Sequence, residues 1–368
     1  MKNTFGNSVC VTLFGESHGA AVGAVLDGMA PGIPVDDAFI EHQMSLRKSL
    51  SALSTARKEP DTVRILCGVY EGRTAGTPIV FLVENTDTRS ADYDALRSVA
   101  RPGHADYTAY CKYHGYSDPR GGGHFSGRIT AGLVAAGAVA ITALRTRGIR
   151  IGTHILSCAG IRDRDFDDTD RDIEVLAGRP FAVLDSAKAE QMKEAITGAK
   201  SEGDSVGGIL ETAVTGFPAG VGEPWFDTLE GVLSHILFSV PAVKGVEFGD
   251  GFALAGMRGS EANDCFYAED GTVKTSTNHC GGILGGISNG MPLLFRCAVK
   301  PTASIYQKQN TVDFLKNENT ELQIHGRHDP AIVHRARVVV DSVTALALCD
   351  MLALRFGTDF LSPTGGIS

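Results

Sequence analysis

Five loops hold most of the side chains that could carry out acid–base or anion-binding chemistry. They are GESHG (15–19), RPGHADYT (101–108), GGGHFSGRITAG (121–132), KPTASI (300–305) and GRHDPAIVHRAR (326–337). Together they supply histidines, hydroxyls and cations but few paired acids. This set suits the binding and protonation of a small, strongly anionic molecule, and it lacks the carboxylate pair of a glycosidase.

Two of these loops carry a candidate proton donor. His18 and His104 each lie beside a glycine in a turn, and histidine titrates near neutral pH. Ser17 directly precedes His18, which is not the spacing of a nucleophile elbow. The alternative for each histidine is a solvent-facing turn residue, and Asp106 could simply cap the helix that follows.

The stretch 121–132 is either an anion site or a loop that enters a helix. Successive glycines can direct backbone N–H groups at one anion, and a helix N-terminus adds a favourable field. Ser126 can donate a hydrogen bond, and Arg128 can bind a carboxylate or phosphate through two. The spacing is not that of a nucleotide P-loop.

The two C-terminal loops offer further cations. Lys300 precedes hydroxyl-bearing residues at the end of an apolar run. In GRHDP, Asp329 either pairs with Arg327 or acts as a base.

Composition indicates a soluble, globular protein. The chain has 368 residues, of which 43% are hydrophobic and 21% charged, and a net charge of −9. The acidic balance argues against broad nucleic-acid or membrane binding. We expect no membrane span and no signal peptide. Eight cysteines without a CxxC pair predict reduced thiols, no metal site and a cytoplasmic location.

Mixed strands and helices must position these loops. Thr130–Arg147 is rich in Ala and Leu, ends at Gly148 and predicts a buried helix. The mixture favours an α+β fold over a doubly wound sheet. The other predicted helices are 226–236 and 343–356, and the predicted strands are 9–14, 22–26, 63–66, 78–83, 208–214 and 292–299.

Two internal repeats predict related halves. Residues 68–81 align without gaps with 282–295, and 22–34 resemble 206–220. Chance similarity of glycine-rich strands is the alternative, but the blocks recur in the same order. We therefore expect a single domain over 1–368 with pseudo-symmetric halves of about 1–190 and 191–368.

The motifs resemble those of the chorismate synthase family. GESHG, RPGHADYT, SGRIT, PAVKGVEFG, TNHCGGILGGISNGMP, KPTAS and GRHDP occur in that family's order, from about Thr4 to Leu354. The resemblance implies a β-α-β sandwich, usually a homotetramer. It also implies a lyase of the shikimate pathway for aromatic amino-acid biosynthesis. Such an enzyme converts 5-enolpyruvylshikimate 3-phosphate to chorismate and phosphate by a 1,4-anti elimination.

The family requires reduced FMN although the reaction has no net redox change. Within it, this flavoprotein cofactor is thought to donate charge transiently and to take up the ring hydrogen at N5. The chain has no apparent reductase domain, so an external reductant such as NADPH is expected.

The resemblance also implies roles for individual residues. His18 and His104 match the histidines thought to protonate the departing phosphate and the reduced flavin. Asp329 matches the aspartate proposed to help deprotonate flavin N5. The implied substrate contacts are Arg47, Arg57, Ser126, Arg128 and Arg327. The implied flavin contacts are His124, Phe125, Ser126, Ala242, Gly285, Lys300, Thr302, Ser304 and Arg327.

The chain departs from the family pattern at the arginine-rich segment. MSLRKSLSA (44–52) keeps only Arg47 and Lys48 as cations, and the second substrate arginine corresponds to Ala52 or Leu53. Arg57 is a hypothetical replacement. An alternative is therefore a family member that binds FMN but has impaired turnover, and a second alternative is a structural or regulatory protein on the same scaffold.

Three smaller departures accompany this one. His124 and Phe125 replace the usual Arg and Ser, Ala30 replaces a proline, and Asp341 replaces a glutamate.

Overall fold

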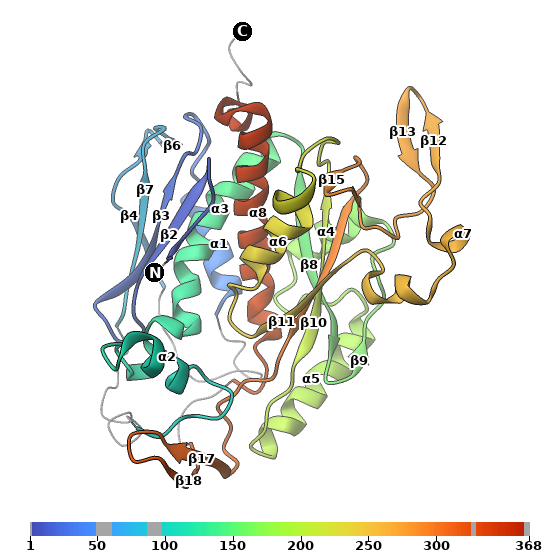
Figure 1. Cartoon of the computed structure of the whole chain (residues 1–368). Helices are drawn as coiled ribbons and strands as arrows, with labels where there is room; N and C mark the ends of the chain where they lie inside the picture. The colour runs from blue at the N-terminus through green and yellow to red at the C-terminus, as the bar shows by residue number, and fades with distance from the viewer. Residues whose placement is uncertain (1, 49–60, 87–97, 325–328, 364–368) are drawn as a thin grey trace.

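Strands with alternating apolar residues build two antiparallel sheets that face each other across a layer of helices (Figure 1). The computed structural model describes residues 2–48, 61–86, 98–324 and 329–363. This arrangement confirms the predicted α+β class and the β-α-β order of layers.

The first sheet has the strand order β1-β2-β3-β7-β4. Along β7, Ile79, Phe81 and Val83 are buried and alternate with more exposed residues, as expected when one sheet face covers the core. The strands are β1 (Thr4–Phe5), β2 (Cys10–Gly15), β3 (Ala21–Asp27), β4 (Val63–Ile65) and β7 (Ile79–Glu84).

The second sheet has the order β11-β16-β10-β8-β9. Along β16, Leu293, Phe295, Cys297 and Val299 are buried with the same period of two. The strands are β8 (Arg150–Cys158), β9 (Ile161–Arg162), β10 (Gly208–Thr215), β11 (Val243–Phe248) and β16 (Leu293–Val299).

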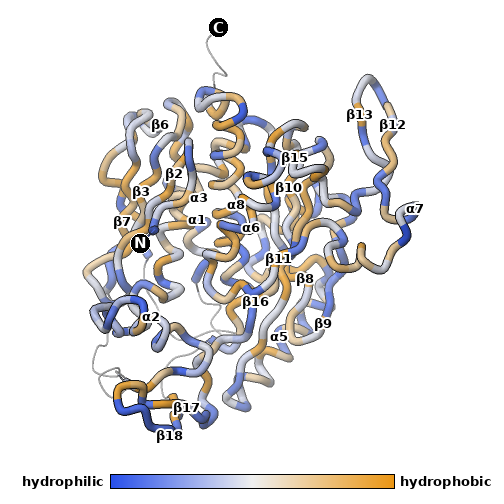
Figure 2. The backbone as a smooth tube through the Cα atoms, in the orientation of Figure 1, coloured by the Kyte–Doolittle hydropathy of each residue, from blue (hydrophilic) through white to orange (hydrophobic). Residues whose placement is uncertain are grey.

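Two long helices, α3 (Thr130–Thr146) and α8 (Val333–Phe356), fill the space between the sheets. Hydrophobic residues dominate this central layer (Figure 2). Gly132 allows α3 to approach β3, because a methyl group there would lie 2.6 Å from the backbone of Gly23. Gly137 likewise allows α3 to approach α8, since a methyl group would lie 2.3 Å from Cβ of Ser342. The helices therefore pack at backbone distance.

The stretch 127–146 has the length and apolar composition of a membrane span. However, 89% of its most apolar window is buried inside the fold, so it packs as the core helix that its sequence predicts.

Shorter elements surround the core. Helix α1 (Asp37–Leu46) begins at an Asp36 cap, and α6 (Leu229–Leu237) at a Thr228 cap. The other helices are α2 (Asp106–Tyr113), α4 (Thr169–Ala177), α5 (Ser186–Ser201) and α7 (Gly259–Ala262). The hairpins are β5–β6 (Val69–Tyr70, Arg73–Thr74), β12–β13 (Phe266–Glu269, Thr272–Thr275), β14–β15 (Ile283–Leu284, Ile287–Ser288) and β17–β18 (Gln309–Asp313, Glu318–Leu322).

All predicted strands and helices are present, with two corrections at helix starts. Helix α8 begins at Val333 and not at 343. The sequence pattern missed its first turns because they contain charged residues, such as Arg337, that are buried in the fold. Helix α6 begins at Leu229 and not at 226, because residues 225–227 form a separate 3-10 turn before the Thr228 cap.

The same hydrogen-bond pattern recurs at one end of both sheets. The Thr74 hydroxyl donates to the Ala30 carbonyl at 2.6 Å, and the Ser288 hydroxyl donates to the Pro218 carbonyl at 2.6 Å. Thr74 and Ser288 occupy matching places in the first repeat. Pro218 thus corresponds to Ala30, whereas the sequence alignment of 22–34 with 206–220 pairs it with Pro34. The structure therefore shifts that alignment by four residues.

The strand orders also correspond across the two sheets. The order β1-β2-β3-β7-β4 in the first sheet matches the order β9-β8-β10-β16-β11 in the second, so β7 corresponds to β16. Helix α3 then corresponds to α8, because α3 comes after β7 in the chain and α8 comes after β16. The division into halves stays a proposal, and this order favours a boundary between α3 and β8 over one near residue 190.

Candidate active site

Three consecutive glycines bring the two candidate histidines to one loop. Gly121, Gly122 and Gly123 all have positive φ, at 59°, 87° and 54°, a conformation that glycine adopts without strain. A methyl group on Gly121 would lie 2.1 Å from Cε1 of His18. One on Gly122 would lie 3.2 Å from Cε1 and Nε2 of His104. Each imidazole therefore packs against a glycine that has no side chain to displace it.

The GESHG turn that carries His18 is anchored on two sides. The Ser17 N–H donates to the Gly123 carbonyl at 3.0 Å, which fixes the turn to the glycine loop. The side-chain amide of Asn85 donates to the carbonyls of Glu16 at 3.0 Å and Gly19 at 2.9 Å. His18 itself is buried.

An acidic neighbour faces the His18 side of the loop. Hydrogen bonds from Arg120 hold the pKa of Asp118 below its usual range, and the charge of His18 lowers it further. Asp118 therefore stays ionised and places a negative charge near His18.

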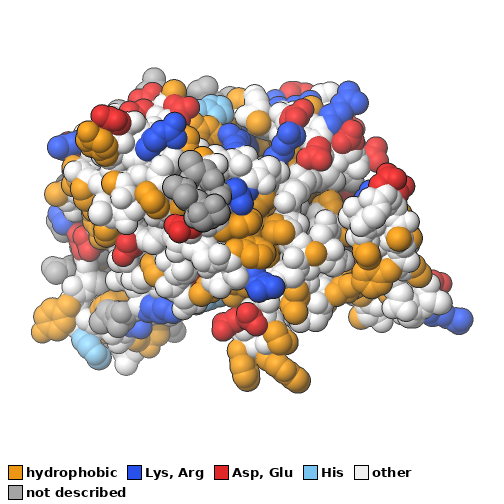
Figure 3. Space-filling model, turned by 90° about the horizontal axis from the view of Figure 1, so that it is seen from above, with side chains coloured by type: hydrophobic (Ala, Val, Ile, Leu, Met, Phe, Trp, Pro, Cys, Tyr) orange, Lys and Arg blue, Asp and Glu red, His pale blue; other side chains and the backbone are white. Residues whose placement is uncertain are grey.

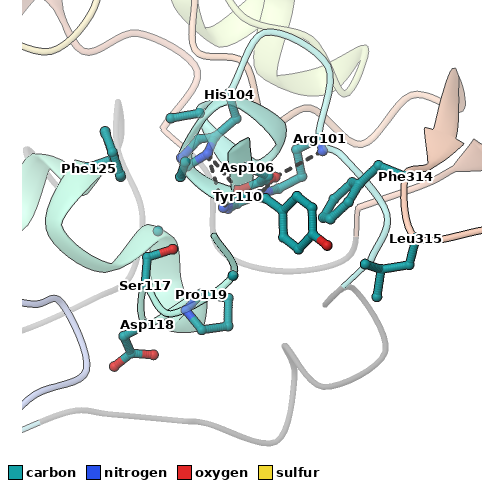
Figure 4. Close-up of a pocket in the computed structure, with 14 residues that line it drawn as sticks. Arg101, His104, Asp106, Tyr110, Ser117, Asp118, Pro119, Phe125, Phe314 and Leu315 are labelled. Carbon is teal, nitrogen blue, oxygen red and sulfur yellow. Dashed lines mark hydrogen bonds and ion pairs between the residues drawn. The ribbon is translucent and has the colours of Figure 1, made fainter. Parts of the chain in front are cut away.

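His104 belongs to a compact triad with Arg101 and Asp106 (Figure 4). Its Nδ1 lies 2.9 Å from Oδ1 of Asp106 and 3.1 Å from Nη2 of Arg101. Burial raises the pKa of Asp106, but hydrogen bonds from Arg101 and His104 outweigh it and hold that pKa well below the usual range. Asp106 and Arg101 therefore hold the Nδ1 side of the ring, and Nε2 faces Gly122.

Arg128 lies in a buried ion-pair cluster. Its Nε donates to Oδ1 of Asn85 at 2.9 Å, its Nη2 donates to the Glu84 carbonyl at 3.1 Å, and its Nη1 pairs with Asp61. The other carboxylate oxygen of Asp61 lies 3.7 Å from Nη1 of Arg47. Asp61 thus joins the two described arginines that the resemblance assigns to the substrate.

Asp329 connects to the same cluster through Arg335. The Arg335 guanidinium pairs with Asp329, and its Nε donates to the Arg47 carbonyl at 2.8 Å. Burial and, to a smaller extent, the charge of Arg335 lower the pKa of the adjacent His334 to about 4.

The KPTAS loop lies against the His104 turn. Nζ of Lys300 donates to the Gly103 carbonyl at 2.5 Å, and the Lys300 N–H donates to the Ala242 carbonyl at 2.9 Å. Ala242 has a φ of 75°, which is strained for a residue with a side chain. Within the described residues, the buried Thr302 hydroxyl has no hydrogen-bond partner. Ser304 is half-buried in the same loop.

The residues that replace the family's Arg and Ser have different surroundings. Nδ1 of His124 donates to the Gly15 carbonyl at 2.8 Å, so this ring braces the end of β2. Phe125 is 38% exposed and packs edge-on against Tyr113, with ring centroids 6.0 Å apart. The Ser126 hydroxyl accepts from the Arg128 N–H at 3.2 Å, which caps the turn before α3.

Gly285 is the one described candidate that lies apart from the others. It lies in the β14–β15 turn, which leads to the Leu293 end of β16, whereas Lys300 follows the Val299 end. Seven residues of strand span about 20 Å. One chain therefore does not bring Gly285 and Lys300 to the same site.

Several predicted positions lie outside the described residues. These are Ala52, Leu53, Arg57 and Arg327.

A pocket of about 300 Å³ opens beside His104 (Figure 4). Its walls are aromatic, with Tyr110 and Phe314 in contact at 4.9 Å between ring centroids, and Phe125. Its polar residues include Arg101 and His104. A planar organic group with polar substituents matches this lining.

Sequence reasoning missed Asp61, Asn85, Arg335, Tyr110 and Phe314. A polar residue directly after an alternating apolar strand was the available signal for Asn85, because strand ends carry functional loops. The others depend on contacts between distant segments. In the described parts of the chain, no group of three or more His, Cys, Asp or Glu side chains could hold a metal ion.

Comparisons with known proteins agree on one family. Residues 9–353 match the family model described as chorismate synthase. The chain is 47% identical to a chorismate synthase of Methanosarcina mazei over 98% of each chain, and 46% identical to one of Pyrococcus abyssi over 95% of this chain and 97% of the relative. It resembles a solved structure titled as a crystal structure of chorismate synthase, with a TM-score of 0.76, 27% identity, and 96% and 94% coverage.

Proposed function

This chain belongs to the chorismate synthase family, and we propose on that premise that it is a lyase of the shikimate pathway. It converts 5-enolpyruvylshikimate 3-phosphate to chorismate and phosphate. The carbon–oxygen bond to phosphate breaks, a ring hydrogen leaves from the far end of the allylic system, and a second ring double bond forms. No net oxidation or reduction occurs.

The observation that supports this proposal most strongly is the pair of imidazoles on Gly121 and Gly122. Two proton donors that pack against adjacent glycines of one loop can serve two groups in a single small site. Cations at Arg128 and Arg47 lie behind the His18 turn, where they offset the charge of a substrate with two carboxylates and a phosphate.

We propose that His18 donates a proton to the departing phosphate and that His104 donates a proton to the cofactor. Asp118 places a negative charge near His18, and Asp106 orients the ring of His104. Asp329, held by Arg335, is the proposed base near the cofactor. Ser126 and Arg47, with Arg57 and Arg327, complete the proposed substrate contacts.

Reduced FMN is the proposed cofactor, and the KPTAS loop fits an anionic group. Among the described residues the Thr302 hydroxyl has no hydrogen-bond partner, so this loop offers a hydrogen-bond donor together with the positive charge of Lys300 and the hydroxyl of Ser304. The chemistry that reduced FMN would supply there, when bound, is a transient source of electron density and an acceptor for the ring hydrogen. Phe125 lines the proposed ring site, and His124 supports it through its hydrogen bond to the Gly15 carbonyl. Ala242, whose carbonyl accepts from the Lys300 N–H, is a further proposed contact. NADPH or another external reductant supplies the reduced flavin.

We also propose a homotetramer in the cytoplasm. Large apolar side chains are exposed on segments that project from the body, including Trp225 at 85%, Phe226 at 96% and Phe252 at 85%. Figure 3 shows hydrophobic side chains gathered on such projecting parts. Contact with further copies would cover them, and a neighbouring chain could supply Gly285 to the flavin site. All eight cysteines are free, as suits a reducing compartment.

The main alternative is a family member that binds FMN with impaired turnover, because the 44–52 segment lacks the usual arginines. The Arg47–Asp61–Arg128 cluster favours an active enzyme, since it retains two cations near the histidine loop.

Anaerobic incubation with reduced FMN and 5-enolpyruvylshikimate 3-phosphate tests the proposal. We expect chorismate and phosphate in equal amounts. Bound flavin with no chorismate at any substrate concentration would favour the alternative, and no flavin binding would favour a structural role.

A further inference from the structure

Asn85 links two parts of the proposed site that are far apart in the sequence. We propose that it is a positioning residue that ties the His18 turn to the Arg128 guanidinium. The inference rests on the proposed function for its effect on turnover, but the tie itself can be tested without turnover.

The amide nitrogen of Asn85 holds the His18 turn. It donates to the carbonyls of Glu16 at 3.0 Å and Gly19 at 2.9 Å, the two ends of the turn. The Asn85 backbone N–H adds a bond to the Ala20 carbonyl at 3.1 Å. Three bonds from one residue thus set the path of the chain on both sides of His18.

The amide oxygen of Asn85 holds Arg128. It accepts from Nε at 2.9 Å, while the neighbouring Glu84 carbonyl accepts from Nη2 at 3.1 Å. Both acceptors lie at the end of β7, a strand buried in the first sheet. The end of β7 therefore fixes the positions of both the His18 turn and the Arg128 guanidinium.

The chemistry of the side chain explains the choice of asparagine. A primary amide offers two donors and an acceptor in one plane, and here each end has a fixed partner. Aspartate has the same shape but only acceptors, so it would face two carbonyl oxygens without a hydrogen bond. Alanine removes both ends of the tie.

Hydrogen exchange measured by mass spectrometry tests the tie in the full chain. The variants are Asn85→Asp and Asn85→Ala. The control is Asn278→Asp, whose amide donates to the Pro292 carbonyl at 2.9 Å in the second half. We expect exchange in peptides covering 15–20 to rise roughly tenfold in both Asn85 variants, and at least as much in Asn85→Asp, because two hydrogen bonds are lost. The control should exchange there like the wild type.

Turnover and flavin binding separate positioning from general damage. We expect kcat to fall by roughly 10²-fold in both Asn85 variants, as for a catalytic group misplaced by about 1 Å. The dissociation constant for reduced FMN should stay within about threefold, because Asn85 has no bond to the KPTAS loop.

Each result bears on the inference separately from the function. Wild-type exchange in Asn85→Asp would overturn the tie, and equal losses of flavin binding and kcat would assign Asn85 to general stability. If the wild type forms no chorismate, the proposed function fails, while the exchange comparison still decides whether Asn85 holds the turn.

Discussion

The contact between Gly121 and His18 predicts a large effect from a single methyl group. In Gly121→Ala, the new Cβ would lie 2.1 Å from Cε1 and 2.3 Å from Nδ1 of His18. Ordinary van der Waals contact begins near 3.4 Å, so the imidazole must move by more than about 1 Å. Because a catalytic group displaced by about 1 Å can lose 10²-fold in rate, we expect turnover to fall roughly 100-fold.

A second cost must be separated from this displacement. Gly121 has a φ of 59°, and alanine in that region costs about 1–2 kcal/mol of stability wherever it occurs. Gly271→Ala is the matched control, because Gly271 has a φ of 74° and a methyl group there would meet nothing within 4 Å. We expect both variants to lose similar stability in urea and only Gly121→Ala to lose turnover.

The assay is anaerobic chorismate formation with saturating reduced FMN, alongside urea unfolding of both variants. Turnover of Gly121→Ala within a few-fold of the wild type would refute the reasoning, because the ring would then not need its observed place. An equal loss of turnover in Gly271→Ala would also refute it, since backbone strain alone would be the cause.

Three further predictions concern charged groups. His104→Ala should fold normally and lower turnover by about 10²–10⁴-fold, the range for a general acid, and unchanged turnover in the same assay would remove His104 from the mechanism. Asp61→Asn should lower the free energy of unfolding by about 3 kcal/mol in urea, because it leaves Arg47 and Arg128 buried without their counter-charge, and a neutral result would mean that water compensates them. Burial lowers the pKa of His154, but the hydrogen bonds that its ring donates to two buried carboxylates outweigh it and raise that pKa above 6.5. The stabilisation that protonated His154 gives the fold is therefore complete below pH 6.5 and is lost as pH rises through its pKa in the folded state. The free energy of unfolding in urea should therefore depend less on pH in His154→Gln than in the wild type between these two pKa values.

The strands and the central helix could be predicted because their signals are local. β7 and β16 show apolar alternation, and the glycine and proline positions of their repeats mark the same turns twice. The start of α8 could not be predicted, because Arg337 and Asp341 are buried charges that pair within the helix, and Arg337 also donates to the Arg179 carbonyl of a distant segment. Periodicity cannot anticipate a charge that distant residues compensate.

The candidate site divides in the same way. His18, His104 and Arg128 stand out in the sequence because glycines surround reactive groups in short loops. Asp61 and Asn85 do not, because their importance comes from partners 67 and 43 residues away. The packing of each imidazole on a neighbouring glycine is likewise a property of three loops that meet only in the fold.

The close crossing of α3 and α8 has a consequence for how the chain unfolds. Each helix completes one half in topology, yet Gly137 brings α3 onto Ser342 at backbone distance, and one hydrophobic core runs through both sheets. Neither half could therefore bury its helix alone. A fragment ending after α3 should expose an apolar helix face and aggregate, while the intact chain should lose both sheets in a single cooperative transition.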